Sequence, residues 1–351
     1  MIDVSHTLER VKATLGRLVD RATPGDGDDD GNDDVGEDPP LVSVVITTYN
    51  RPSYLRKSVR SVLDQTYEPI ELVVVDDCSD EPATETLAEM DLDALSASMC
   101  LRHPTNRGAN AARNTGVRAS SGEYVAFLDD DDRWKPEKIE RQVDAFEAAS
   151  DDVGVVYTGI ETIRPEGRGV EIPPPIEGDL TKALLCRNDI GSMSVVMVRG
   201  DVAREVQLDE EFETWADLEW YIRLSTVSRF ERIPDPLVVY EYTSHGRLSD
   251  DFEKERRSYR RFLDRFDPLA AEYGWLFHRK MRAWAAFRVG SDALYTGHYP
   301  QARRYLSTSV SQYPFERRFL IYWLASLGGH VTYRLAQRAS GVAGRASRVL
   351  G

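Results

Sequence analysis

Four consecutive aspartates, Asp129 to Asp132, follow an apolar run in the sequence YVAFLDDDDRW. Four carboxylates at one strand end repel one another unless a divalent cation or basic side chains neutralise them. Oxygen-rich sites of this kind suit Mg²⁺ or Mn²⁺ together with phosphate oxygens. The alternative is an acidic cluster that precedes a helix and is stabilised by the helix dipole. No G-x-x-x-x-G-K-[ST] loop occurs in the chain, which argues against a P-loop nucleotide hydrolase.

A second acidic pair, Asp76 and Asp77, ends another apolar run in ELVVVDDCSD. Carboxylates at such a strand end can accept hydrogen bonds from a ribose hydroxyl or a base N–H. Simple turn chemistry is the alternative, because Asp and Ser favour turns. Between the two acidic clusters, segment 106–114 (NRGANAARN) leads into a helix and offers cationic and amide donors to a diphosphate.

Alternating strands and helices must position these residues. Short β-branched runs predict strands, and apolar residues spaced three and four apart predict helices. We predict an α/β fold with strands at 41–47, 71–75, 98–102 and 124–128 and helices at 54–63, 84–92 and 109–119. Ligands of such sheets bind beyond the carboxyl ends of the strands, where the acidic clusters and segment 47–50 lie.

The second half of the chain has a looser pattern. It predicts a strand at 194–198, a helix at 215–225 and, beyond residue 253, an almost continuous helical region. Within this region, segment 285–314 has the small-residue spacing of one helical hairpin that resembles a tetratricopeptide unit, and a single hairpin does not make an array.

Three segments together resemble the nucleotide-binding half of the family 2 glycosyltransferases, which share the GT-A fold. They are VSVVITTYNRPSYLRKSVRSVLDQTY, ELVVVDDCSDE and NRGANAARNTGVRASSGEYVAFLDDDDRW, and the resemblance covers about residues 41 to 249. It implies that a nucleotide-diphosphate sugar is the donor. Thr47 and Tyr49 would lie against the base, Asp77 with Asp76 beside it would read the base, and Arg113 would lie near the diphosphate.

The resemblance also maps the family's acidic metal motif onto Asp129 to Asp131. Asp131 is then expected to be the direct ligand of a divalent metal, Mn²⁺ or Mg²⁺. Asp129 and Asp130 are expected near the ribose and around the metal.

The family places a catalytic carboxylate at the start of a helix, usually in a Glu-Asp pair followed by aromatic and apolar residues and Arg-Leu. Here TWADLEWYIRL fits, with Ala216 in place of the usual first acid. Asp217 is therefore the expected base and Glu219 the fallback, while helix capping is the alternative role for Asp217. The base would remove a proton from the acceptor hydroxyl in one in-line displacement that inverts the anomeric centre.

Two further features refine the resemblance. His245 and Ser249 fall where relatives often carry a His and a Ser, so His245 is expected to meet the diphosphate or the metal, and an ordinary surface histidine is the alternative. The Gln-x-x-Arg-Trp signature of processive polysaccharide synthases is absent. Transfer of a single sugar is therefore favoured over chain extrusion.

The formal net charge of -15 disfavours a nucleic-acid polymer as partner. The three cysteines show no disulfide or metal-ligand spacing, and the N-terminus lacks the pattern of a signal peptide, so a cytoplasmic setting fits. Seven lysines stand against thirty-seven arginines in this acidic chain. That balance favours a protein kept soluble at high salt, and an ordinary acidic protein from a GC-rich genome is the alternative.

The chain divides into four predicted parts. Residues 1–22 form an amphipathic helix, 23–40 an acidic disordered linker, 41–250 a GT-A domain and 251–351 a helical region. Within the GT-A domain, 41–134 is the nucleotide-binding half and 135–250 the acceptor half. The segment 314–351 is basic and carries a short apolar stretch, 319–327, which favours peripheral contact with the inner face of the cell membrane. Packing on the helical hairpin is its alternative.

A membrane contact implies a lipid-linked saccharide as acceptor. Composition and a basic tail together resemble the haloarchaeal transferases that build dolichol-phosphate-linked N-glycans for surface-layer glycoproteins. Two other functions remain open from the sequence. A sugar nucleotidyltransferase would carry a glycine-rich basic loop after the first strand, where this chain has TTYNR. A non-catalytic scaffold is the second, and Ala216 is the residue that favours it.

Overall fold

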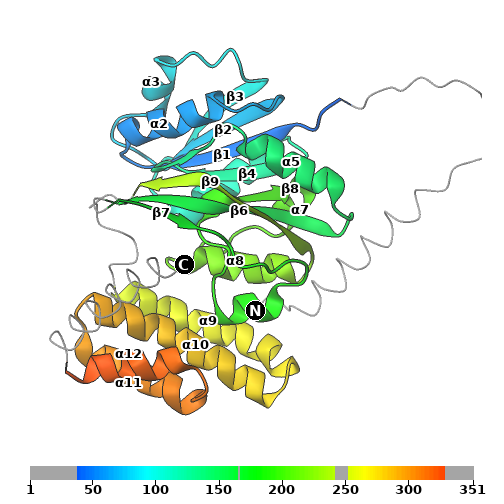
Figure 1. Cartoon of the computed structure of the whole chain (residues 1–351). Coiled ribbons are helices and arrows are strands. Elements are labelled where there is room, and N and C mark those ends of the chain that lie inside the picture. The colour runs from blue at the N-terminus through cyan, green and yellow to red at the C-terminus, as the bar shows by residue number, and fades with distance from the viewer. Residues whose placement is uncertain (1–37, 165–166, 242–251, 329–351) are drawn as a thin grey trace, which may run out of the picture.

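The computed structural model describes residues 38–164, 167–241 and 252–328 (Figure 1). A twisted sheet with helices on its faces forms one part of the molecule, and a layer of long helices forms the other, with helix α8 between them (Figure 1). The predicted helix 1–22, nearly all of the acidic linker, His245, Ser249 and the tail beyond residue 328 lie outside the described residues.

Nine strands of the described residues form one mixed sheet in the order β3-β2-β1-β4-β8-β6-β9-β5, with β7 paired to β6. The strands are β1 Val42–Thr48, β2 Ile70–Asp76, β3 Ala97–Arg102, β4 Tyr124–Asp129, β5 Asp132–Trp134, β6 Val153–Arg164, β7 Gly167–Glu171, β8 Val196–Arg199 and β9 Arg229–Glu241. The helices are α2 Pro52–Leu63, α3 Ala83–Ala88, α4 Ala109–Ala119, α5 Lys138–Ala148, α6 Thr181–Cys186, α7 Gly200–Glu205, α8 Ala216–Ser225, α9 Phe252–Glu272, α10 Trp275–Tyr295, α11 Tyr299–Gln312 and α12 Arg317–Leu327.

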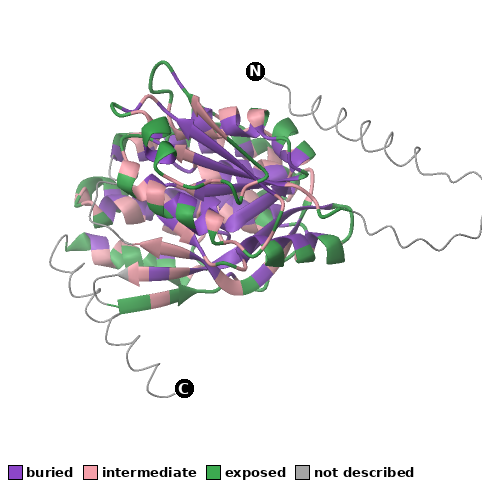
Figure 2. Ribbon diagram, turned by 90° about the horizontal axis from the view of Figure 1, so that it is seen from above, coloured by how far each residue is buried: buried purple, intermediate pink, exposed green. Residues whose placement is uncertain are grey.

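The first four strands are parallel neighbours, which confirms the predicted α/β half. Strands β1, β2 and β4 are almost wholly buried, because helices cover both faces of this part of the sheet (Figure 2). Helix α4 approaches β1 so closely that a Cβ on Gly116 would lie 2.4 Å from a methyl carbon of Val45. This close packing fixes the C-terminal half of α4 against the sheet.

Two predicted elements differ from the structure. The helix expected at 84–92 ends at Ala88, because the Asp91 carboxylate accepts a hydrogen bond from the amide of Asp93 and offers the backbone a turn instead. The strand expected at 194–198 begins as a 3₁₀ turn over Met193–Val195, in which the Ser192 hydroxyl accepts from the amide of Ser194. The strand β8 then starts at Val196.

The C-terminal part is helical as predicted. Helices α10 and α11 form the expected hairpin around Gly297, whose φ of 86° suits glycine, and a Cβ on Gly290 would lie 2.8 Å from Leu306. Helix α9 packs between this hairpin and α8 (Figure 1). In the described parts of the chain, no helix combines the length and apolar character needed to cross a membrane.

Candidate active site

The sheet register brings the separate acidic clusters to one edge. Thr47 lies beside Asp129 on one neighbouring strand, and Thr48 lies beside Asp76 on the other. Tyr49 follows directly and is 47% exposed, so its ring is accessible at this edge. The predicted assembly of the first, second and fourth strand ends is therefore present in the fold.

Asp76 and Asp77 have different surroundings. Asp76 is fully buried, and its two carboxylate oxygens accept hydrogen bonds from the amides of Ser79 and Ala83. Its burial disfavours the expected direct contact with a base and favours the turn role.

Asp77 holds the start of α4 in place. Its oxygens accept from the amides of Arg107 and Gly108 at 2.9 and 2.7 Å, and one of them also contacts His103 Nδ1 at 2.7 Å. Gly108 has a φ of 89°, which a residue with a side chain rarely adopts. Asp77 thus shapes the loop that carries the predicted diphosphate donors.

Arginines neutralise the carboxylates that follow β4. Arg113 Nη2 lies 2.6 Å from Asp129 Oδ1, while Arg51 Nη1 lies 3.1 Å from both Asp130 and Asp131. Burial raises the pKa of Asp130 to about 6, although Thr48 and Arg51 oppose the shift by bonding its carboxylate. The roles of Thr48 and Arg51 went unrecognised in the sequence, although both stand in the TTYNR segment beside the residues singled out there.

These carboxylates fit a divalent cation that is shared with a ligand. Asp131 keeps 38% of its side chain exposed, and burial together with Asp129 raises its pKa. The neighbouring Asp132 is buried, and its Oδ1 has no hydrogen-bond partner among the described residues. The described residues contain no group of three acidic, His or Cys side chains able to hold a metal alone. One or two protein carboxylates plus substrate phosphates is the arrangement that Mg²⁺ commonly takes.

Asp217 lies in the first turn of α8, close to the donor-side residues. Asn188 Nδ2 donates to its Oδ2 at 2.7 Å, and its own neighbour Leu218 donates a backbone N–H to Oδ1. Burial raises the pKa of Asp217, while the charges of Arg288 and Arg113 lower it again. A partly buried carboxylate, held by two donors and flanked by two arginines, can act as a base near neutral pH.

Glu219, the fallback base, has a different environment. It is fully buried, and its carboxylate binds the guanidinium groups of Arg223 and Arg265. These ion pairs join α8 to its own last turn and to α9. The arrangement disfavours a role for Glu219 in proton transfer and favours a structural one.

The C-terminal helices supply residues that local sequence motifs did not reveal. Trp215, at the N-cap of α8, adopts a left-handed backbone with a φ of 62°, and its Nε1 donates to Glu255 of α9 at 2.6 Å. Arg288 of α10 lies over the same indole ring, with its guanidinium carbon 5.1 Å from the ring centroid. Glu255 and Arg288 are far from Asp217 in sequence, so no spacing pattern could have indicated them.

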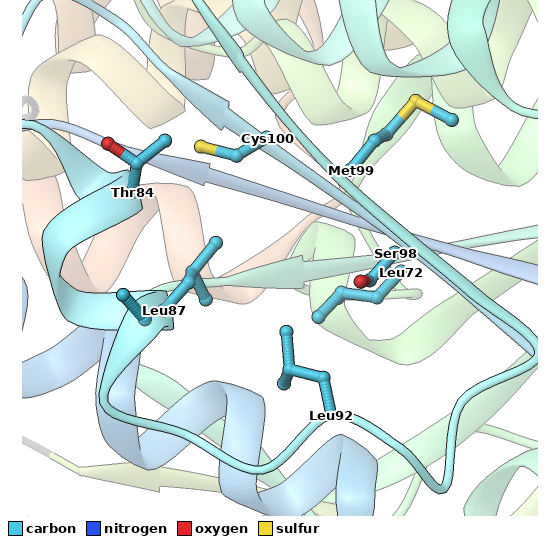
Figure 3. A pocket seen from close by; sticks show the side chains of 8 residues that line it. Leu72, Thr84, Leu87, Leu92, Ser98, Met99 and Cys100 are labelled. Atoms are coloured by element: carbon cyan, nitrogen blue, oxygen red, sulfur yellow. The ribbon is translucent and has the colours of Figure 1, made fainter.

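A pocket of about 250 Å³ elsewhere in the molecule has a different character (Figure 3). It lies between α3 and the edge strand β3, and its lining is mostly apolar, including Leu72, Leu87, Leu92 and Met99. Carboxylates and arginines are absent from its lining, so the chemistry described above belongs to the strand-end site.

The environment of Asp217 predicts a defined pH response. If Asp217 is the base expected from the sequence, it acts in its deprotonated form, and burial raises its pKa, so activity should fall on acidification at a pH above the ordinary aspartate range. Asn188→Asp keeps the oxygen that accepts from the amides of Ile190 and Gly191 but places a like charge beside Asp217. The acidic limb of kcat should then move upward by about one pH unit or more.

The alkaline plateau of the same pH profile serves as the control. At alkaline pH both carboxylates are ionised, so the Asn188→Asp plateau should approach that of the unsubstituted protein. An unmoved acidic limb would show that Asp217 is not the group that titrates.

The chain is similar to known glycosyltransferases in sequence. Residues 43–201 match the family model described as glycosyl transferase family 2. The chain is 31% identical over 185 residues to TuaG of Bacillus subtilis, named as a teichuronic acid biosynthesis glycosyltransferase, covering 51% of this chain and 72% of that protein. It is 40% identical over 116 residues to an uncharacterized glycosyltransferase of Nostoc sp., which covers 33% of this chain but only 35% of that protein.

Solved structures share the fold at low sequence identity. Residues 1–349 of S. aureus TarS in complex with UDP-GlcNAc align with a TM-score of 0.54 and 15% identity, covering 81% of this chain and 91% of that one. The mannosyltransferase PcManGT of Pyrobaculum calidifontis, in complex with GDP-Man and Mn²⁺, aligns with a TM-score of 0.51 and 19% identity over 97% of each chain. The predicted GT-A fold with a helical C-terminal region is confirmed.

Proposed function

The chain belongs to glycosyl transferase family 2 and is a glycosyltransferase that uses nucleotide sugars, and we propose that it transfers one sugar, with inversion, to a lipid-linked saccharide. The observation that carries this proposal is the position of Asp217. Its pKa responds to both Arg113 and Asp129, which puts a candidate base within electrostatic range of the predicted diphosphate and metal residues.

Each part of the site has a role in this reaction. Tyr49 and Thr47 would contact the nucleotide base, and Asp77 would keep the Arg107–Gly108 loop open toward the donor. Arg113 would give up part of its ion pair with Asp129 in order to bind the diphosphate. Asp217 would accept the proton of the acceptor hydroxyl as that oxygen attacks the anomeric carbon.

A divalent cation would be held by Asp131, with Asp129 beside it and donor phosphates completing its ligands. When bound, it supplies positive charge that stabilises the departing nucleoside diphosphate. Arg51, which now pairs with Asp130 and Asp131, would then be free to meet phosphate oxygens. Mn²⁺ in the P. calidifontis mannosyltransferase supports this part of the proposal by similarity of fold.

Family membership argues against the two alternative functions. A sugar nucleotidyltransferase would need a glycine-rich basic loop after β1, whereas β1 leads into TTYNR and the Pro52 start of α2. A scaffold would not need an accessible carboxylate beside the donor residues.

The direct test of the proposed function is a donor screen. Purified protein with Mn²⁺ should release nucleotide from one sugar nucleotide in a panel of UDP and GDP sugars, and should do so faster when lipid-linked saccharide is added. A strain that lacks the gene should accumulate the acceptor, whose mass identifies the missing sugar. Absence of nucleotide release from every donor would refute the proposal.

Helix α12 supports contact with a membrane surface. Phe319 is fully buried, with its ring centroid 4.9 Å from Trp284 and 5.0 Å from Phe287, so the helix packs on α10. Four aliphatic side chains of this helix are about half exposed, and they are Leu320, Ile321, Leu324 and Leu327. Arg317 and Arg318 precede them, so an apolar face and basic residues adjoin.

A vesicle assay tests this contact. Ile321→Asp should lower the fraction that sediments with anionic vesicles, with a partition coefficient reduced about tenfold because burying a side chain of this size is worth about 1.5 kcal/mol or more. Val170→Asp, at an exposed position on the edge strand β7, is the matched control and should sediment normally. Equal loss in both variants, or in neither, would contradict a specific contact through α12.

A further inference from the structure

The C-terminal helices form one wall of the candidate active site. Thr214 and Trp215, which precede α8, bond to Ser258 and Glu255 of α9. The Trp215 ring also meets the edge of Phe262 at a centroid distance of 5.5 Å. These contacts hold the left-handed backbone of Trp215 and thereby the first turn of α8, which carries Asp217.

Arg288 projects from α10 into this wall. Its charge interacts with Asp217, Glu255 and Asp189, yet each of these acids bonds to another group. Asp217 binds Asn188, Glu255 binds the Trp215 indole, and Asp189 pairs with Arg187 at 3.1 Å. Among the residues that the structure describes, Arg288 makes no ion pair within 4.0 Å.

Arg288 is half-buried, and a half-buried guanidinium without a bonded counter-ion gains a charge-assisted hydrogen bond when an anion binds. Arg113 already meets Asp129 on the donor side, and Asp217 interacts with both arginines. The charge of Arg288 acts on Asp217 from the side of the C-terminal helices, opposite in origin to that of Arg113 in the nucleotide-binding half. This placement favours the acceptor as its partner.

We propose that Arg288 binds one anionic group of the acceptor, a carboxylate or a phosphate, and thereby places the acceptor hydroxyl beside Asp217. The proposal rests on the proposed function and narrows it to acceptors that carry negative charge close to the reacting hydroxyl. The planar guanidinium suits bidentate binding of either group, and a lysine would supply charge without that geometry.

Binding of small acceptor analogues tests the proposal. Calorimetric titrations would use methyl glucoside, methyl glucuronide and glucose 6-phosphate, with Mn²⁺ and either UDP or GDP present so that the donor subsite is filled. The intact chain should bind at least one charged sugar about tenfold or more tightly than the neutral one, as expected for one charge-assisted pair. Preference for the glucuronide indicates a carboxylate acceptor, and preference for the phosphate indicates a phosphorylated one.

Variants assign the preference to Arg288. Arg288→Gln should bind charged and neutral sugars alike, and Arg288→Lys should keep only part of the preference. Arg303→Gln, at an exposed arginine of α11, should behave as the unsubstituted protein. Melting temperatures of all three establish that they are folded, and if Arg288→Gln is not, Arg288→Lys carries the comparison.

Two results would overturn the proposal. One is equal binding of charged and neutral sugars by the unsubstituted protein. The other is an undiminished preference for charged sugars in the folded Arg288 variants. If the acidic limb of their pH profile moves while that preference is kept, Arg288 acts on Asp217 alone. Failure of the donor screen is a separate result, because it would appear in the unsubstituted protein as absence of nucleotide release.

Discussion

Asp217→Asn should reduce kcat by about 100-fold to 10,000-fold, the range that a general base contributes, while donor affinity stays within about twofold. The amide cannot accept the acceptor proton, but it has nearly the shape of the carboxylate and can still accept from the amide of Leu218. Single-turnover transfer and a separate titration with the nucleoside diphosphate measure the two quantities independently.

Glu219→Gln is the matched control on the same helix. Glu219 is buried between Arg223 and Arg265, so its substitution should lower the melting temperature by removing the negative charge that pairs with both guanidinium groups. The turnover of the folded fraction should change little. A large loss of kcat in folded Glu219→Gln, with full activity in Asp217→Asn, would mean that Glu219 is the base and that Asp217 has the structural role.

Asp131→Asn should raise the Mn²⁺ concentration needed for half-maximal activity by about tenfold or more, because one anionic ligand of a hard cation becomes neutral. The loss should be partly recovered at high Mn²⁺, whereas Asp217→Asn should not respond to added metal. Binding of Mn²⁺ in the presence of UDP, followed by electron paramagnetic resonance, gives a readout that does not depend on turnover.

Asp144→Asn removes the same charge from an exposed position on α5 and serves as the control for net charge. Its metal response should match that of the unsubstituted protein. An unchanged metal requirement in Asp131→Asn would assign the metal to other residues, with Asp129 the next candidate. Loss of activity in both variants would point to a general electrostatic effect instead of a ligand.

The donor side of the site could be predicted from local sequence because its signals are contiguous. A β-branched run that ends in Asp76-Asp77 or Asp129 to Asp132 specifies both the strand and the position of the carboxylates at its end. Helix α4 was predicted with its exact bounds, Ala109–Ala119, since Gly108 and a run of small residues mark its start. Roles for Thr47, Tyr49, Asp77, Arg113, Asp129 to Asp131 and Asp217 remain proposals, and the variants above test those of Asp131 and Asp217.

Burial and pairing depend on residues distant in sequence, so local patterns could not separate equivalent acids. Asp76 and Asp77 are adjacent, yet Asp76 is enclosed by the turn at Ser79 and Asp77 holds the Arg107–Gly108 loop. Glu219 lies two residues after Asp217, but its carboxylate forms an ion pair with Arg265 of α9.

The sequence by itself determined the α/β framework, the family and the acids at the strand ends, because strand propensity and strand-end position are properties of neighbouring residues. Only the tertiary structure decided which acids remain accessible and that the charge of Arg288 of α10 acts on Asp217. The physical reason is that a side chain's desolvation and its ionic partners are set by packing between α8, α9 and α10, elements whose contacts leave no periodic signal along the chain.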